Sequence, residues 1–404
     1  MAICNRAPGG TRAFISVSVL AAALVGTSGH AVADKGAEHQ SIQIRPSYLG
    51  VSGSNIRFQV VNGSSYCYAG TLGALVTDGA ESFVLSNNHV LALENAATIG
   101  DKVIQPGLLD ENGDANSCSA AGTDYSPYVV GELSNYVPLA FGGINTVDAA
   151  IARIDPCDGA GCIDPQGRIL DIGGLSDDTV DFTNLQDLVG LAVQKSGRTT
   201  GLTTGSIAAV GVSVTVTYDF GSATFEDQIL VGGDKGAFIK AGDSGSLLAT
   251  QPAGAGALPQ AVGLLFAGSV SGVAIANRID KVLAAFDVGM VGCTADCGDG
   301  GATSGGKGGG GGGGGKGGGG KGNGPRGGAV AAGLDMAAEV RGRHEHALLA
   351  NPDVVGTGLS LDDQGDPEIQ VYVRGARRPA GFTIPNQLDG VKVRVVVTGE
   401  FRAL

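Results

Sequence analysis

The chain has 404 residues and a formal net charge of −13; 43% of its residues are hydrophobic and 16% are charged. This apolar fraction is too high for a disordered chain, and the charge is too sparse for a coiled coil. The acidic balance argues against a nucleic acid or an anionic membrane as partner, because both need a basic face. Glycine accounts for 71 residues with no collagen period, and these glycines are unevenly distributed.

The first 33 residues have the pattern of a secretory signal peptide. Arg6 and Arg12 precede an apolar run over 14–26, and residues 31–33 (AVA) supply an A-x-A cleavage site. The run is shorter than the roughly 20 apolar residues of a membrane-spanning helix. We therefore predict cleavage after Ala33, an N-terminal extension over 34–44, and a secreted or periplasmic protein that is free of the membrane after cleavage.

Six cysteines follow the signal peptide. An even number in an oxidising compartment suggests disulfides, but the sequence alone does not decide among about 15 pairings. No histidine lies near these cysteines and their spacings match no zinc pattern, so we predict no metal site. Short loops make Cys157–Cys162 and Cys293–Cys297 the simplest pairs, which leaves Cys67–Cys118.

A glycine-rich stretch divides the chain. Residues 298–328 contain 21 glycines among 31 positions and no apolar side chain that could anchor a core. Because glycine has the largest backbone entropy cost on ordering, we predict a disordered Gly/Lys linker.

The segments on either side of the linker differ in their patterns. Residues 45–297 contain short β-branched and aromatic runs between Gly, Asn and Asp clusters, which predicts an all-β sandwich or barrel. Residues 329–404 predict a small α+β module. The clearest expected strands of the first segment are 58–61, 82–85 and 212–217, and in the module we expect a helix over 331–349 and strands over 354–361, 368–374 and 391–398.

Of the five histidines, only His89 lies inside the β-rich segment. His30 belongs to the signal peptide and His39 to the ragged new N-terminus. His344 and His346 lie on the exposed-looking module helix, where residues two apart do not share a face, so we interpret both as solvated. A lone histidine after a strand is usually structural, so His89 needs partners to indicate a site.

A serine on a glycine-flanked turn supplies one such partner. Ser244 lies in the stretch 241–246 (AGDSGS). Flanking glycines let a substrate carbonyl approach closely, and backbone N–H groups around the serine can converge on a developing oxyanion.

An acidic residue is then needed to orient the imidazole. Asp148 opens an apolar stretch, 148–152 (DAAIA), which would bury its carboxylate. Asp101 is the best alternative, while the other aspartates between His89 and Ser244 lie mostly in polar turns. We predict that Asp148 is the partner of His89.

These residues resemble the chymotrypsin-like serine peptidases. Three stretches look like that family's His, Asp and Ser motifs in the family's chain order, and a fourth is similar to a segment of bacterial trypsin-like peptidases of the streptogrisin type. The resemblance covers about residues 48–290 and implies a double β-barrel with the site in the cleft between the barrels. The stretches are 85–90 (LSNNHV), 147–152 (VDAAIA), 242–245 (GDSG) and 195–205 (KSGRTTGLTTG).

The resemblance implies a role for each residue. Ser244 would be the nucleophile and His89 the general base, with Asp148 fixing the imidazole tautomer. The backbone N–H groups of Gly242 and Ser244 would form the oxyanion hole. The reaction would be hydrolysis of a peptide bond, or of an ester bond, through an acyl-enzyme, with no metal or cofactor. A catalytically inactive, peptidase-like binding protein is the alternative.

Two further predictions concern the surroundings of Ser244. No Ile-Val-Gly-Gly-type start follows Ala33, so a new N-terminus is not expected to pair with Asp243; bacterial members use an internal arginine, and we predict that Arg198 does so here. In the expected substrate pocket stand Phe238, six residues before Ser244, and Gly268. The absence of an acid there disfavours cleavage after Lys or Arg and favours an apolar or small residue before the scissile bond.

The role of the module is open. Its stretches 352–358 and 399–404 resemble a segment that precedes the peptidase domain in some bacterial trypsin-like proteins. One hypothesis is an inhibitory or chaperone-like segment that docks on the barrels, and the other is a module that binds substrate or a surface.

Overall fold

A computed structural model describes residues 35–61, 64–110, 124–155, 162–252, 254, 256–293, 327–376 and 383–404. The predicted signal peptide, residues 298–326 of the predicted linker, and Cys118, Cys157 and Cys297 lie outside these ranges. Each predicted disulfide therefore has one member outside the description, and the pairing stays a prediction. None of the helices in the described ranges has the length and hydrophobicity to cross a membrane.

Strands between residues 51 and 154, together with the later strand β17, form an eight-stranded antiparallel sheet in the order β17-β5-β6-β10-β8-β7-β1-β4. Its buried face is aliphatic, with Leu72, Val84, Leu85 and Val103 fully covered. A separate hairpin pairs β2 (Gln59–Val61) with β3 (Ser64–Tyr66). The strands of the sheet are β1 (Val51–Asn55), β4 (Gly70–Leu72), β5 (Ala74–Thr77), β6 (Ser82–Ser86), β7 (Lys102–Ile104), β8 (Val129–Tyr136), β10 (Ala150–Ile154) and β17 (Gly289–Met290).

A second sheet closes on itself. Neighbours pair in the order β12-β11-β14-β15-β16-β13, and the long strands β12 and β13 also pair with each other. β9 (Ile144–Asn145) adds to β13. The strands are β11 (Ala192–Gly197), β12 (Gly201–Thr217), β13 (Ser222–Gly233), β14 (Leu247–Thr250), β15 (Ala261–Ser269) and β16 (Ala274–Arg278).

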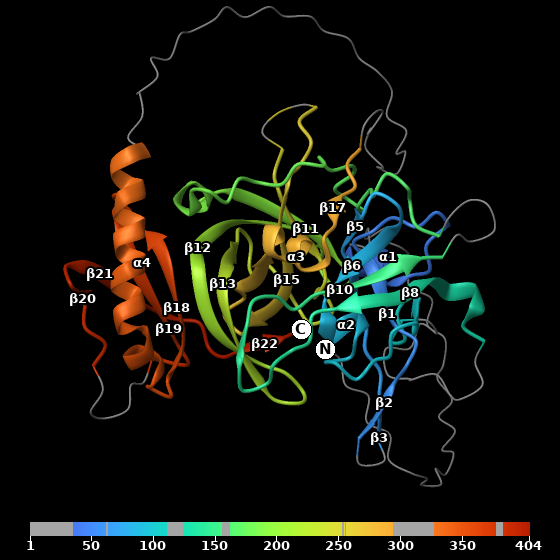
Figure 1. Ribbon diagram of the computed structural model, residues 1–404, viewed down its shortest axis with the longest axis horizontal. Coiled ribbons are helices and arrows are strands. Elements are labelled where there is room, and N and C mark those ends of the chain that lie inside the picture. Colours follow the sequence, from blue (N-terminus) through green and yellow to red (C-terminus); the bar gives the residue numbers. More distant parts are fainter. Residues whose placement is uncertain are drawn as a thin grey trace, which may run out of the picture.

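Two curled sheets therefore lie side by side, as Figure 1 shows. The predicted all-β class and its chymotrypsin-like double barrel are confirmed. Helices are few in the described ranges. Before the module there are three helices, α1 (Lys35–Gln40), α2 (Asn88–Leu91) and α3 (Ile279–Phe286), and two 3-10 turns, Ser126–Tyr128 and Leu185–Leu188.

The N-terminal extension is more ordered than the sequence suggested. α1 contains His39, which is only 1% exposed, and its Nδ1 lies 2.8 Å from Gly50 O. The placement of His39 at a ragged terminus was therefore wrong. The sequence pattern missed it because a single polar helix turn has no period.

The module has the predicted elements. The expected helix is α4 (Gly327–Leu349), so Gly327 and Gly328 belong to it rather than to the linker. Leu334, Val340 and Leu348 are buried, and Figure 1 shows α4 lying across β18 and β19. The strands are β18 (Val354–Leu361), β19 (Pro367–Val373), β20 (Gln387–Leu388), β21 (Val391–Val397) and β22 (Phe401–Ala403).

The module extends the second barrel, because β18 pairs antiparallel with β12. Close approach there requires glycine. A Cβ at Gly356 would lie 2.4 Å from Ser213 O, and one at Gly358 would lie 2.4 Å from the Tyr372 hydroxyl. These two glycines account for the repeated Gly in residues 352–358. Core side chains of the module and of the barrel belong to one buried cluster.

Candidate active site

His89 and Asp148 meet where the first sheet faces the second. His89 lies in α2, directly after β6, and Asp148 precedes β10, which pairs with β6. The His89 Nδ1 lies 2.6 Å from Asp148 Oδ2, and the backbone N–H of His89 donates to Asp148 Oδ1 at 3.2 Å. Both side chains are buried. The competing candidate, Asp101, instead contacts Arg57 at 3.3 Å.

Two asparagines of the LSNNHV stretch hold this arrangement. Asn87 Nδ2 donates to the backbone carbonyl of Asp148 at 2.7 Å. Asn88 Nδ2 donates to Val137 O at 2.7 Å, and Asn88 Oδ1 accepts the N–H of Asn95. Side-chain amides therefore tie the His89 turn to the segments that follow β8 and precede β10.

Tyr218 is a contributor that the sequence analysis missed. It follows β12, and its hydroxyl donates to Asp148 Oδ2 at 2.9 Å. Its ring lies edge-on to the imidazole of His89, with centroids 5.9 Å apart. Burial, followed by the Asp148 charge, raises the pKa of Tyr218 well above its ordinary value, so the hydroxyl stays protonated and can donate. No local motif marks a tyrosine at a hairpin tip.

Glu94 is a second residue that the sequence analysis missed. Its buried carboxylate accepts the backbone N–H groups of Asp219 at 3.1 Å and Phe220 at 3.0 Å. It thereby fastens the turn after β12 against the segment that follows α2. Burial, more than any other cause, raises the pKa of Glu94.

Opposing effects set the pKa of His89. Burial alone would lower it, but the charge and hydrogen bond of Asp148, with the charge of Glu94, outweigh burial and raise the pKa above its ordinary value. The imidazole is thus a stronger base than a histidine in water.

Ser244 lies on the turn before β14, between two glycines with positive φ. Gly242 has φ +95° and Gly245 has φ +92°. A Cβ at Gly245 would lie 2.2 Å from both Ser86 Oγ and Thr71 O, so only glycine fits there. Ser244 Oγ donates to Phe266 O at 3.0 Å.

Backbone N–H groups beside Ser244 are held in fixed directions. The carbonyl of Ala241 accepts from Thr199 Oγ1 at 2.6 Å, and that of Asp243 accepts from Ser246 N at 3.0 Å. Each carbonyl fixes the peptide plane of the following N–H, which belongs to Gly242 or Ser244. Within the described residues neither N–H donates a hydrogen bond. Both are available to an oxyanion.

Asp243 pairs with Lys195 instead of Arg198, so the predicted pair was wrong. Lys195 Nζ lies 3.4 Å from Asp243 Oδ2, and neither side chain is exposed. Backbone N–H groups of Thr199 and Thr200 donate to Asp243 Oδ1 at 2.8 and 3.0 Å. Burial lowers the pKa of Lys195, and the Asp243 charge opposes that shift.

Arg198 instead binds Asp110. Its Nε and Nη2 donate to the two Asp110 carboxylate oxygens at 2.5 and 2.6 Å. The backbone at residue 198 continues out of β11, where alternate side chains face opposite ways, so Lys195 and Arg198 point to different sides.

Of the predicted pocket residues, Phe238 belongs to the buried core of the second barrel and Gly268 lies in β15. Phe238 is fully buried, and its N–H donates to Gly272 O at 3.0 Å. A Cβ at Gly268 would lie 2.8 Å from Ile239 Cγ2 and 2.6 Å from Leu404 Cδ1.

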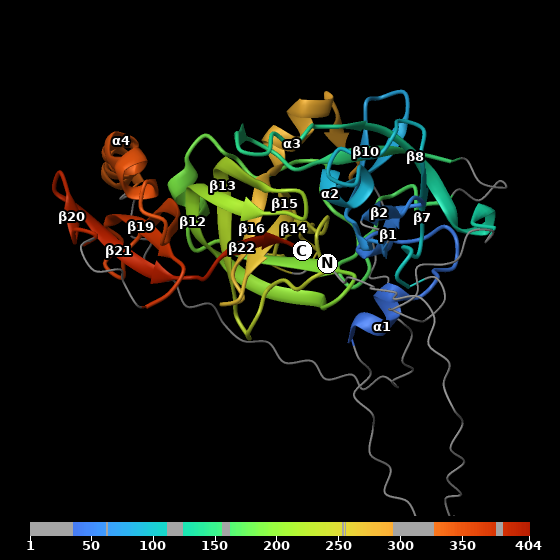
Figure 2. The ribbon, with the colours of Figure 1, turned by 90° about the horizontal axis from the view of Figure 1, so that it is seen from below.

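The last residue of the sequence lies against both His89 and Ser244. Leu404 N–H donates to Ser244 Oγ at 3.2 Å, and Leu404 O lies 3.4 Å from His89 Nε2. Figure 2 shows β22 leading from the module to the junction between the sheets, near α2.

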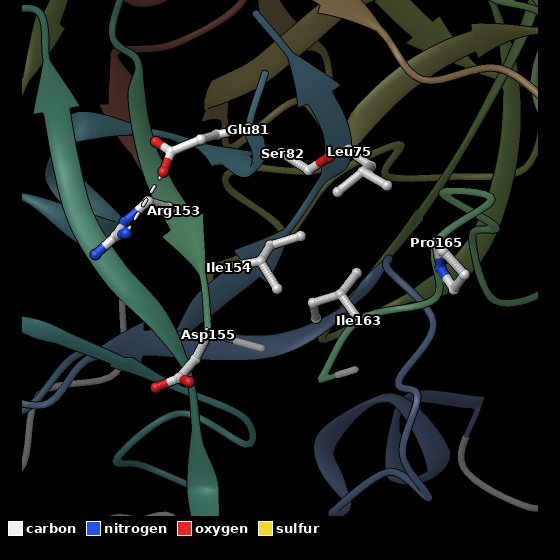
Figure 3. A pocket seen from close by; sticks show the side chains of 8 residues that line it. All are labelled: Leu75, Glu81, Ser82, Arg153, Ile154, Asp155, Ile163 and Pro165. Carbon is white, nitrogen blue, oxygen red and sulfur yellow. Dashed lines mark hydrogen bonds and ion pairs between the residues drawn. The ribbon is translucent and has the colours of Figure 1, made fainter. Parts of the chain in front are cut away.

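A separate pocket of about 400 Å³ lies away from these residues, against β5, β6 and β10. Figure 3 shows its mixed lining, in which Arg153 contacts Glu81 beside Ile154 and Ile163. Among the described residues, no cluster of three or more His, Cys, Asp or Glu could hold a metal ion.

A family model described as the Nal1 C-terminal domain matches residues 165–284, less than a third of the chain. No curated protein matches.

Similar solved structures are serine proteases. A glutamic acid specific serine protease is 23% identical, with a TM-score of 0.37 and coverage of 60% of this chain and 100% of that chain. Thermobifida fusca protease A is 19% identical, with a TM-score of 0.35 and coverage of 59% and 98%. Cellulomonas bogoriensis chymotrypsin is 19% identical, with a TM-score of 0.32 and coverage of 59% and 98%. Similarities this low assign neither an activity nor a substrate to the chain.

Proposed function

We propose that the chain is a secreted serine endopeptidase that hydrolyses peptide bonds through an acyl-enzyme. The observation that carries the proposal is the buried 2.6 Å contact between His89 and Asp148, with Ser244 across the same cleft. Leu404 contacts both His89 and Ser244, so a single residue of a peptide can reach the base and the nucleophile together.

The proposed chemistry assigns one task to each group. Ser244 Oγ turns from Phe266 O towards His89 Nε2, gives up its proton and attacks the substrate carbonyl. The N–H groups of Gly242 and Ser244 stabilise the oxyanion. The protonated imidazole then gives its proton to the leaving amine. In the second half of the reaction, His89 takes a proton from water, the water attacks the acyl group, and the imidazole returns a proton to Ser244 Oγ.

Asp148 and its neighbours prepare the base. Asp148 Oδ2 accepts the Nδ1–H of His89, which leaves Nε2 free to accept the serine proton, and the Tyr218 hydroxyl donates to the same oxygen. This hydrogen bonding fixes the tautomer before substrate arrives.

A second candidate is a peptidase-like protein that binds without catalysis. It is favoured by the Ser244 rotamer, since Oγ donates to Phe266 O, and by the contact of Leu404 with both His89 and Ser244. In this case the site would bind peptides without hydrolysing them.

Digestion of a denatured protein mixture separates the two candidates. The full-length protein should produce new peptide ends, identified by mass spectrometry, and Ser244→Ala should abolish them. A folded protein that yields no new ends, with or without the Leu404→Glu change, would support the binding protein. Recovery of the protein from the culture medium or periplasm with Asp34 as its first residue would test the predicted export.

A further inference from the structure

We propose that residues 401–404 occupy the acyl side of the cleft as a substrate does, and that the site therefore selects extended peptides with leucine before the scissile bond. This inference rests on the proposed peptidase function and specifies its substrate class. Its basis is the path of β22 and the position of Leu404.

Backbone pairing gives β22 the geometry of an added substrate strand. It pairs antiparallel with β15, in the register Ala267 with Ala403 and Gly268 with Arg402. Its other edge pairs with β12, which makes β22 an inserted strand. Main-chain pairing of this kind binds an extended peptide whatever its sequence, and the side-chain pockets then select among peptides.

Leu404 packs its side chain into the second barrel at the end of this strand. Its side chain reaches Gly268, where any Cβ would lie 2.6 Å from Leu404 Cδ1. It packs against the buried cluster that contains Phe238 and Ile239. Its backbone contacts Ser244 Oγ and His89 Nε2 at 3.2 and 3.4 Å. The Leu404 side chain thus lies on the acyl side of Ser244, while its carbonyl oxygen faces His89 Nε2 and not the N–H groups of Gly242 and Ser244.

Phe401 supplies the second side-chain contact. It is fully buried in the cluster with Phe266, and its ring lies edge-on to Tyr372 at 6.2 Å. Between the two apolar positions, the Arg402 side chain is 66% exposed. The groove therefore recognises an apolar residue at the acyl position and another three residues earlier, and it leaves the side chain at Arg402 unselected.

A peptide substrate must displace these residues. A tethered segment competes at a high effective concentration, on the order of millimolar for short flexible connections. Weakening the Leu404 contact should raise the affinity for added peptides, whereas changing the exposed Arg402 should not.

Binding tests the inference without requiring catalysis. Leu404→Glu puts a charge in the apolar pocket while keeping the buried Phe401, and Arg402→Ala is the matched control on the same strand. Each is combined with Ser244→Ala and titrated with fluorescein-labelled peptides that end in Phe-Arg-Ala-Leu or Phe-Arg-Ala-Glu, with fluorescence anisotropy as readout. We expect the Leu404→Glu protein to bind the leucine peptide at least tenfold more tightly than the glutamate peptide. The Arg402→Ala protein should bind the leucine peptide only as weakly as the protein with the unmodified tail does.

Equal affinity for the two peptides, or binding unchanged by Leu404→Glu in a folded protein, would overturn the inference. Cleavage then separates it from the proposed function. The Leu404→Glu protein with Ser244 intact should hydrolyse a leucyl aminomethylcoumarin peptide at least tenfold faster than the arginyl or glutamyl peptides. Selective leucine binding with no hydrolysis would refute the proposed peptidase function and leave the inferred leucine selectivity intact. Hydrolysis without a preference for leucine would refute the inferred selectivity and leave the peptidase function intact.

Discussion

Replacing Lys195 should destabilise the protein more than any exposed charge change, because it leaves Asp243 buried without a counter-charge. Both side chains are completely buried, with Lys195 Nζ 3.4 Å from Asp243 Oδ2. Removing one partner of a buried pair costs about 3–5 kcal/mol. Asp243 would keep the hydrogen bonds from Thr199, Thr200 and Lys240. We therefore expect Lys195→Met to lower the free energy of unfolding by about 3 kcal/mol, at the lower end of that range.

Urea unfolding followed by circular dichroism measures this loss. The matched control is Arg153→Met, since Arg153 and Glu81 form an ion pair with both side chains 50% exposed, and such pairs contribute at most about 1 kcal/mol. Adding Asp243→Asn to Lys195→Met should recover stability, because the unpaired buried charge is gone. If Lys195→Met costs no more than Arg153→Met, the pair does not hold the Ser244 turn and the reasoning fails.

Two predictions concern the imidazole of the candidate site. Tyr218→Phe removes a hydrogen-bond donor to buried Asp148. Because hydrogen bonds to charged groups contribute about 1.5–3 kcal/mol, kcat/KM should fall by roughly tenfold or more. Asp148 would then hold a protonated His89 more strongly, so the acid limb of the pH profile should move to higher pH. Glu94→Gln removes a charge that raises the pKa of His89. Because His89 must be neutral to accept a proton, the acid limb of the pH profile should move to lower pH. An acid limb that does not move in a folded, active variant would contradict this electrostatic account.

The elements that the sequence predicted are those whose signals are local. The strand that became β18 has β-branched residues bounded by turn residues, and the stretches around His89, Asp148 and Ser244 each have a local pattern. Their convergence then follows from the pairing of β6 with β10 and from the turn before β14.

The features that the sequence did not predict depend on distant partners. Lys195 and Arg198 are three residues apart, and nothing local indicates which of them reaches Asp243. Tyr218 contacts Asp148 across 70 positions of sequence, and Leu404 contacts Ser244 across 160. Only the closure of the second barrel and the extension of its sheet by the module bring these residues together.

Labelling with a fluorophosphonate tests the central claim most directly, because the reagent reacts with a serine only when a neighbouring base and an oxyanion site activate it. We predict a single adduct on Ser244, located by peptide mapping, in the folded full-length protein and more rapidly in Leu404→Glu. The adduct should be absent from Ser244→Ala and strongly reduced in His89→Ala. A folded Leu404→Glu protein that forms no adduct on Ser244 would contradict the proposed peptidase.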